Sequence, residues 1–162
     1  MRITGGEVGG RRIKVPKGIR PTQDKIRAAI FNILGDKIKG AKFVDLFAGS
    51  GSVGIEAISR GASEVIFVEK SRKVLAVLNE NLKSLGCVNK SKVIMADALK
   101  VKIETPDIIF ADPPYDKGFA KKVIDLWLKS KTLLILEHSK REKVDIGTHH
   151  TFGDTVITLI SE

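Results

Sequence analysis

Residues 112–115 carry the groups needed to hold a flat heterocycle by an exocyclic amine. They read Asp112, Pro113, Pro114 and Tyr115, and they follow the apolar run 108–111, which predicts a buried strand. Each proline fixes φ and lacks an N–H donor, and the residue before it is kept out of the helical region. The acid and a proline carbonyl can therefore accept bonds from the amine while the tyrosine ring stacks on the base. A plain proline-terminated strand explains these four residues equally well, so other features must decide.

A glycine-rich loop follows the first predicted strand of the main sheet. The strand is expected at residues 42–47, and it runs through Gly49 and Gly51 into a predicted helix. Glycines let the backbone bend sharply and let a ligand approach the main chain, and the helix N-terminus offers unpaired N–H groups. With Gly54 the loop satisfies the G-x-G-x-x-G pattern of dinucleotide sites, although that pattern alone is a weak signal. Phe47, at the end of the strand, is interpreted as a core residue that can also touch a ligand.

Four acids stand at the ends of four successive predicted strands: Asp45, Glu69, Asp97 and Asp112. In an open parallel sheet these strand ends line one crevice, where ligands bind. Asp45 would repel a pyrophosphate but attract an ammonium group, Glu69 can accept from two ribose hydroxyls, and Asp97 can accept from an adenine amine. A ligand with an ammonium, a ribose, an adenine and a positive sulfonium matches this set, so S-adenosylmethionine is the predicted cofactor. Lys70 and Ala98 are included in the same predicted site.

The segments that position these residues alternate between strand and helix patterns. Strands are predicted at residues 42–47, 64–69, 92–95, 107–111 and 132–137, and helices at 52–60, 71–85 and 118–128. A further helix is expected to start at Pro21, with Thr22 as its N-cap, and to stop at Gly35. The alternation predicts an α/β fold with a mostly parallel sheet. Residues 143–151 and 155–160 predict a C-terminal hairpin that brings the sheet to seven strands.

The chain is strongly basic, and its charge is concentrated near the N-terminus. The 162 residues have a formal net charge of +9, and residues 1–27 hold eight basic residues against Glu7 and Asp24. A small hairpin of residues 2–4 with residues 12–15 is expected in this segment. Such a basic arm is typical of proteins that bind nucleic-acid phosphates, although a solubilising surface has the same composition. The residues predicted to contact RNA are Arg2, Arg11, Arg12, Lys14 and Arg20.

Composition argues against several other classes of protein. No apolar run approaches the roughly 18 residues of a membrane span, and the N-terminus lacks the apolar core of a signal peptide. The single Cys87 excludes an internal disulfide, which is expected in the reducing cytoplasm. His138, His149 and His150 have no companions spaced for a metal site, so no metal is expected. We expect a cytoplasmic globular protein that is a monomer.

Taken together, the motifs resemble a known family. The loop Asp45–Gly51 and the turn Asp112–Tyr115 are similar to those of class I aminomethyltransferases, which modify exocyclic nitrogens of bases. The N-terminal patterns narrow the resemblance to the bacterial RsmD family of 16S ribosomal RNA guanine-N2 methyltransferases. These patterns are Ile3-Thr4-Gly5-Gly6, Gly10-Arg11-Arg12, residues 18–27 and Phe31-Asn32. The resemblance runs almost end to end, except that the segment between Glu137 and the final hairpin is short.

The resemblance implies a Rossmann-like class I methyltransferase fold, S-adenosylmethionine as cofactor, and ribosomal RNA as partner, free or within the small ribosomal subunit. It divides the chain into a basic RNA-binding extension at residues 1–20 and a methyltransferase domain at residues 21–162. In that family the arginine-proline-threonine segment helps to close the cofactor site, so Arg20, Thr22 and Asp24 inherit this role. Residues 112–115 would hold the guanine amine after the base has been flipped from its stack.

Three other functions remain open on the sequence. An adenine-N6 DNA methyltransferase would use the same Asp-Pro-Pro-Tyr segment, but the chain is short and has no added DNA-reading domain. A nicotinamide-dependent oxidoreductase would use the same glycines, yet it leaves Asp45 and residues 112–115 without a role. A non-catalytic RNA-binding module would need only the basic arm, and the acids of the crevice argue against it.

Overall fold

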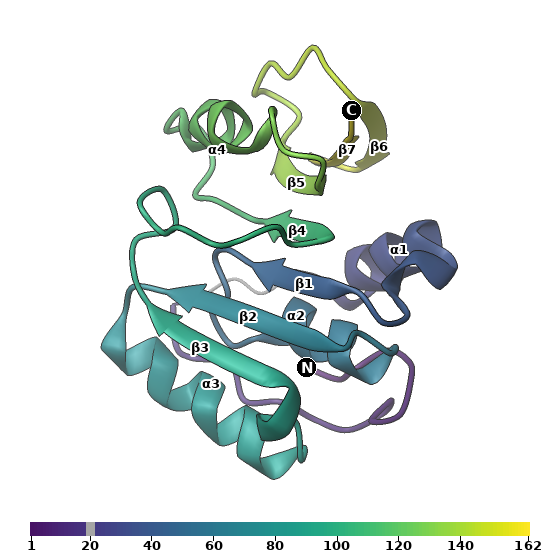
Figure 1. Ribbon diagram of the computed structural model, residues 1–162, viewed down its shortest axis with the longest axis vertical. Helices are drawn as coiled ribbons and strands as arrows, with labels where there is room; N and C mark the ends of the chain where they lie inside the picture. Colours follow the sequence, from purple (N-terminus) through teal and green to yellow (C-terminus); the bar gives the residue numbers. More distant parts are fainter. Residues whose placement is uncertain (19–21) are drawn as a thin grey trace.

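Seven strands form one mixed sheet within residues 1–18 and 22–162, which are the residues that the computed structural model describes. The strands are β1 (Lys42–Asp45), β2 (Glu64–Glu69), β3 (Ser91–Met95), β4 (Ile108–Ala111), β5 (Leu133–Ser139), β6 (Thr148–Phe152) and β7 (Thr155–Ile160). Their order is β3-β2-β1-β4-β5-β7-β6 (Figure 1). The first five run parallel, and β7 lies antiparallel between β5 and β6. This arrangement confirms the predicted fold class, with the C-terminal hairpin at one edge.

The central strands are apolar because both of their faces are covered. All four residues of β4 are buried, and Phe43 and Val44 of β1 are fully buried. Successive side chains of a strand point to opposite faces, so Phe43 and Phe110 enter one core while Val44 and Ile109 enter the other. Parallel strands that are covered on both faces read as continuous apolar runs, which is why these segments could be predicted.

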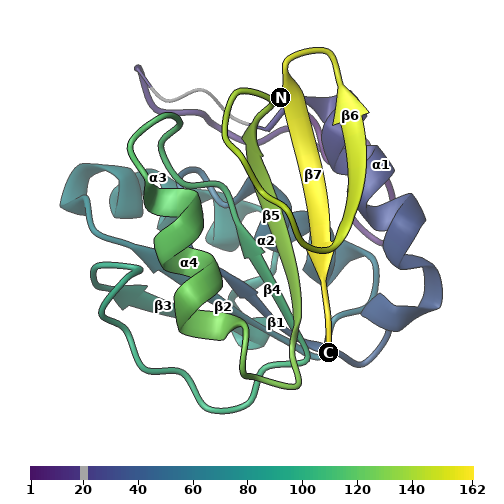
Figure 2. The same cartoon turned by 90° about the horizontal axis from the view of Figure 1, so that it is seen from above.

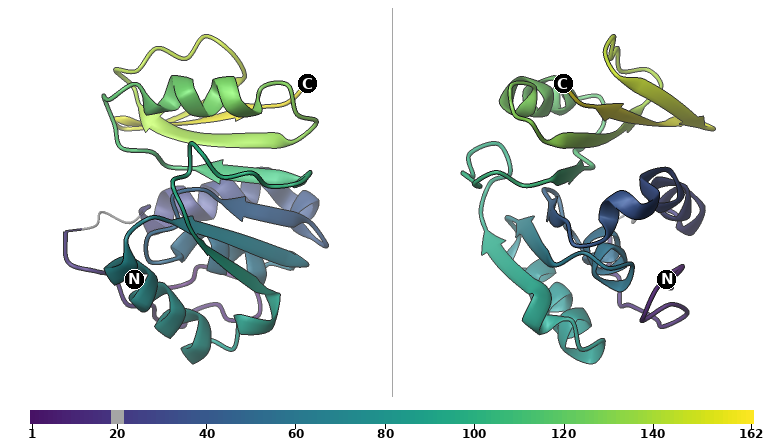
Figure 3. Two further views of the ribbon diagram at one scale, coloured as in Figure 1. Left: turned by 60° about the vertical axis from the view of Figure 1, so that its left-hand side comes forward. Right: turned by 45° about the vertical axis from the view of Figure 1, so that its right-hand side comes forward.

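Helices cover the two faces of the sheet unequally. The helices α1 (Asp24–Leu34), α2 (Ser52–Ser59) and α3 (Arg72–Ser84) pack on one face, whereas α4 (Phe119–Trp127) packs on the other (Figure 2 and Figure 3). Beside α4, the segment that joins β3 to β4 covers the second face with side chains that include Leu99 and Val101. Short 3-10 helices occupy Gly35–Ile38 and Val88–Lys90. Among the described residues, no helix is long and apolar enough to cross a membrane.

Some elements begin or end elsewhere than the sequence predicts. β5 continues to Ser139 rather than ending at residue 137, because its last residues pair with the start of β7. β6 begins at Thr148 rather than at residue 143. The predicted cap of α1 is wrong, because Gln23 is the N-cap residue and the Thr22 hydroxyl bonds to another part of the chain. Gly35 ends α1 as expected.

The N-terminal segment folds back on itself and packs against the helices. Arg2 and Arg12 form an antiparallel bridge, which is a minimal form of the predicted hairpin. Ile3 and Ile13 are buried in the same core as α1, α2 and α3. Gly6 has a φ of +79°, and a Cβ at this position would lie 2.0 Å from a carbonyl oxygen at the end of α2. The close approach of the segment to α2 therefore requires glycine here.

A buried ion pair ties this segment to α1 and α2. Arg27 of α1 and Glu56 of α2 are both fully buried, and Arg27 Nε lies 2.9 Å from a carboxylate oxygen of Glu56. Glu56 also accepts a bond from Thr4 N at 2.9 Å. Arg27 donates in addition to the carbonyl oxygens of Arg2 and Thr22. These bonds satisfy both ions, and without them a buried charge pair would be strongly destabilising.

Candidate active site

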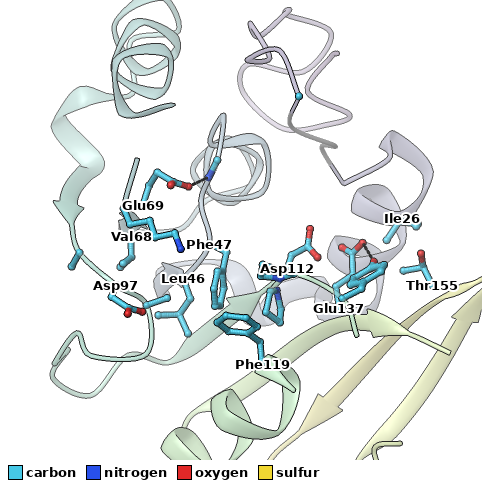
Figure 4. Close-up of a pocket in the computed structure, with 18 of the residues that line it drawn as sticks. Ile26, Leu46, Phe47, Val68, Glu69, Asp97, Asp112, Phe119, Glu137 and Thr155 are labelled. Carbon is cyan, nitrogen blue, oxygen red and sulfur yellow. Dashed lines mark hydrogen bonds between the residues drawn. The ribbon is translucent and has the colours of Figure 1, made fainter. Parts of the chain in front are cut away.

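A cavity of about 610 Å³ opens at the carboxyl ends of the parallel strands (Figure 4). Its walls come from the loops that follow β1, β2, β3 and β4, and from Glu137 of β5 and Thr155 of β7. Phe119 of α4 and the start of α1 complete it. Open α/β sheets bind ligands at this edge. The crevice predicted from the strand-end acids therefore exists as a cavity.

The cavity brings together most of the predicted site residues. Its lining includes Phe47, Gly49, Glu69, Lys70, Asp97, Ala98, Asp112, Pro113, Pro114 and Tyr115. Three other predicted residues, Asp45, Gly51 and Thr22, do not line it. The lining residues that the sequence did not single out for the site are Gly18, Gln23, Ile26, Leu46, Val68, Ala96, Phe119, Glu137 and Thr155.

Glu69, at the end of β2, fixes the glycine loop. One of its carboxylate oxygens accepts Gly49 N at 3.1 Å, and the other accepts Ser71 N at 2.9 Å. A carboxylate has about four lone-pair sites, so these two bonds leave acceptor capacity toward the cavity. Glu69 can thus hold the loop in place and accept hydroxyl groups of a ligand at the same time.

The other glycines of the loop serve its packing. Gly51 is the N-cap of α2 with a φ of +85°, and a Cβ there would lie 2.3 Å from the Leu78 side chain. A Cβ on Gly54 would lie 2.2 Å from the ring of Phe67. Larger residues would push α2 away from β2 and α3. These glycines therefore allow the close packing that leaves the main chain of Gly49 at the cavity wall.

Asp45 is buried at the start of the glycine loop. Its Oδ2 accepts Gly54 N at 3.0 Å, while its Oδ1 has no hydrogen-bond partner within residues 1–18 and 22–162. Burial raises the pKa of this carboxyl to about 7; the bond from Gly54 lowers it, and the negative charge of Glu69 raises it. A buried acceptor without a donor is unfavourable, and a positively charged ligand group nearby would relieve it. Because Asp45 does not line the cavity, its charge would act on such a group from beneath the glycine loop and not through the cavity wall.

Asp97 and its neighbours form the wall that follows β3. Asp97 Oδ1 accepts Leu99 N at 2.9 Å, which closes a turn and leaves the carboxylate exposed at the cavity. Ala98 is buried beside it. Lys70, after β2, is exposed at the rim. This part of the cavity combines an acceptor with apolar surface, as an adenine ring with an amine requires.

The turn after β4 is joined to β5 through Glu137. Tyr115 Oη donates to Glu137 Oε1 at 2.9 Å, and Thr22 Oγ1 donates to Glu137 Oε2 at 3.2 Å. Burial, and then the negative charges of Glu137 and Asp112, raise the pKa of the Tyr115 hydroxyl, so it stays protonated and remains a donor. Sequence reasoning assigned no role to Glu137, although an acid next to the apolar run 133–136 was a usable signal.

The predicted RNA-contacting residues already make contacts within the protein. Lys14 pairs with Glu80 of α3 at 2.8 Å, and Arg2 donates to Gly10 O at 3.0 Å. Arg12 is exposed, and Arg20 lies outside the described residues.

The contact of Arg11 with α3 gives the distance between this part of the basic segment and the cavity. It donates to Ser84 O at 2.5 Å, at the last residue of α3. The first residue of α3 follows closely after Lys70 at the cavity rim, and its 13 residues span about 20 Å. Arg11 therefore lies about one helix length from the cavity.

Comparisons with known proteins point to methyltransferases. The family model described as conserved hypothetical protein 95 matches residues 1–157. The chain is 36% identical to the putative rRNA methyltransferase YlbH of Bacillus subtilis, over 98% of this chain and 91% of that protein. It is 37% identical to ribosomal RNA small subunit methyltransferase D of Escherichia coli K12, over 85% of this chain and 74% of that protein. Among solved structures, the putative methyltransferase yhhF from Escherichia coli is 32% identical with a TM-score of 0.85, and the match covers 98% of this chain and 96% of that one.

Proposed function

The chain belongs to the RsmD family of ribosomal RNA small-subunit methyltransferases, and we propose that it methylates the exocyclic N2 of a guanine in 16S ribosomal RNA. The methyl donor is S-adenosylmethionine. One observation carries the proposal: a single cavity joins Glu69 and Asp97 to the amine-holding turn 112–115. Methyl transfer requires donor and acceptor to meet at near-attack distance, and this cavity holds the residues proposed for both.

Residues on the β1–β3 side of the cavity would hold the cofactor. Glu69 would accept from the ribose hydroxyls and Asp97 from the adenine amine, with Phe47, Lys70 and Ala98 as further contacts. Asp45, with its unpartnered oxygen, supplies negative charge that suits the cofactor's ammonium. When bound, S-adenosylmethionine supplies an electrophilic methyl group on a positive sulfonium. The residues present thus fit this cofactor.

Residues on the β4–β5 side would orient the amine. The lone pair of N2 is delocalised into the guanine ring, which makes the amine a poor nucleophile. Asp112 and the carbonyl of Pro113 would accept its N–H bonds and favour the pyramidal form, in which the lone pair is available. The Tyr115 ring would stack on the flipped base. Asp112 need not be a strong base, because the proton can leave after the methyl group has been transferred.

Residues 1–20 would serve as an RNA-binding extension to the methyltransferase domain at 21–162. Its exposed cations would neutralise phosphates and position the RNA without reading its sequence. Arg2, Arg11, Arg12 and Lys14 are all exposed. Because Arg11 lies about a helix length from the cavity, the RNA would run along α3 toward the site.

The test uses the purified protein, tritium-labelled S-adenosylmethionine and unmethylated 16S ribosomal RNA, both free and in small subunits. We expect label in N2-methylguanine, identified by mass spectrometry of the nucleosides, with at least one of these substrates. Asp112→Ala should lose the transfer, whereas the matched control Asp125→Ala, an exposed acid on α4, should keep it. Label in N6-methyladenine, or no transfer to either form of the RNA, would refute the proposal.

A further inference from the structure

Asp112 and Glu137 lie next to each other at the ends of adjacent parallel strands. Ala111 of β4 is in register with Leu136 of β5, and the two acids are the next residues of their chains. Neighbouring strands lie about 4.8 Å apart, and residues in register on parallel strands point to the same face of the sheet. Both acids line the cavity, and Figure 4 shows their carboxylates in the same part of it. The cavity therefore contains a pair of neighbouring acceptor groups.

The Glu137 carboxylate is fixed in place by two hydroxyl groups. It is 4% exposed, and its two oxygens accept bonds from Tyr115 Oη and Thr22 Oγ1. Thr22 is itself held through its carbonyl oxygen, which accepts Arg27 Nη1 at 3.2 Å. Since both hydroxyls donate to Glu137, the group presents acceptor oxygens and not a donor to its surroundings.

The edge of guanine that carries N2 suits such a pair of acceptors. Guanine has two adjacent donors there, N1–H and the N2 amine, and enzymes that flip a base read this edge by hydrogen bonds. A guanine that gives its N2 amine to Asp112 and the Pro113 carbonyl turns N1–H toward a neighbouring group. Adenine differs at the corresponding atom, because its N1 is an acceptor.

We propose that Glu137 selects guanine by accepting N1–H of the flipped base while Asp112 and Pro113 hold its N2 amine. This inference rests on the proposed function and adds the residue that rejects adenine. An adenine in the same position would turn its N1 lone pair toward the Glu137 carboxylate, so that two acceptors would face each other and N1 would gain no hydrogen bond, which buried sites penalise strongly. Glu137 touches the edge of the base and not the transferred methyl group, so it determines specificity.

The experiment compares two bases that share the N2 amine. The methylated guanine is first located by mass spectrometry of nuclease fragments of the labelled RNA, and RNA fragments centred on it then carry either guanine or 2-aminopurine at that position; 2-aminopurine keeps the amine but has an acceptor at N1. For the wild-type protein, kcat/KM should favour guanine on the order of a hundredfold. In Glu137→Gln the amide can donate to N1, and the preference should fall at least tenfold. Comparing this ratio between the two proteins cancels the different reactivity of the two amines.

The control is Glu104→Gln, an exposed acid before β4, which should keep the wild-type preference. Calorimetric binding of S-adenosylmethionine by Glu137→Gln shows that the variant is folded. An equal loss of kcat for both bases would mean that Glu137 acts only by holding Tyr115, and it would overturn the inference. A wild-type protein whose kcat/KM does not favour guanine over 2-aminopurine would also overturn the inference. A wild-type protein that gives no N2-methylguanine with either free 16S ribosomal RNA or small subunits would instead refute the proposed function, so the two failures are distinguishable.

Discussion

Replacing Asp45 by Asn should stabilise the protein at alkaline pH. The pKa of this buried carboxyl is about 7 in the folded protein, against 3.8 for the unperturbed group. A raised pKa means that the folded protein binds the proton more tightly than the unfolded chain does. Stability is therefore lost as the pH rises from about 4 to about 7, and it is not regained above that. A difference of about three pH units, at about 1.4 kcal/mol per unit, amounts to about 4 kcal/mol.

Asparagine does not titrate, so the Asp45→Asn variant lacks this pH-dependent loss. At pH 5 the unfolded carboxyl is already ionised, and about 1–2 kcal/mol of the loss is present there. The difference in the free energy of unfolding between the variant and the wild type should therefore be about 3 kcal/mol more in the variant's favour at pH 8.5 than at pH 5. Urea unfolding of both proteins at both pH values measures this gap. The double difference removes any constant effect of the changed hydrogen bond to Gly54.

Equal pH dependence in the two proteins would refute the reasoning, because it would show that the protein interior does not disfavour a charge at position 45. Asp125→Asn, on the exposed side of α4, is the control and should follow the wild-type curve. A group that destabilises the fold at neutral pH is a candidate for function, since active sites are where such perturbed groups gather. The same variant should therefore bind S-adenosylmethionine more weakly.

Four further changes test other parts of the site and the fold. Glu69→Ala should weaken S-adenosylmethionine binding by about 1–3 kcal/mol in calorimetry, because it removes a charged acceptor; unchanged affinity would remove the ribose assignment. Asp112→Ala should lose most turnover while its cofactor affinity persists, and a fall in that affinity would instead place Asp112 in the cofactor site. Arg11→Glu combined with Arg12→Glu should weaken RNA binding and flatten its dependence on salt, and an unchanged salt slope would make the segment a solubilising surface only. Arg27→Met should lower the free energy of unfolding by about 3 kcal/mol, because the buried Glu56 carboxylate loses one of its two cationic partners and keeps only Arg60; a loss near zero in denaturant titrations would show that Arg60 and the other donors compensate.

The fold could be predicted because its signals are local. The apolar runs of β1 and β4, and Gly35 at the end of α1, identify elements without knowledge of their partners. Boundaries that depend on distant partners were missed. Ser139 extends β5 only because it pairs with Thr155 of β7, and no local pattern carries that pairing.

The site could be predicted in part, because parallel topology brings strand ends together. Glu69, Asp97 and Asp112 line one cavity as the pattern indicates. Asp45 follows the same pattern but bonds to the start of α2 and is buried, and the direction of a side chain next to a glycine loop cannot be read from spacing. Glu137 stands at the end of the apolar run 133–136 and so follows the same pattern, but the hydroxyls of Tyr115 and Thr22 that fix it come from segments distant in the sequence.

Charge counting near the N-terminus overstates the surface that RNA can reach. Arg27 belongs to the basic segment by sequence, yet it is fully buried against an acid of α2. Lys14 remains exposed but is paired with Glu80 of α3, and such partners are distant in sequence.

The exposed cations of this segment include Arg11, which lies about 20 Å from the cavity along α3. An RNA that contacts both Arg11 and the cavity must therefore span several base pairs of an A-form helix. The arrangement therefore favours a long, structured RNA over a free nucleotide, which is what a substrate within ribosomal RNA would provide.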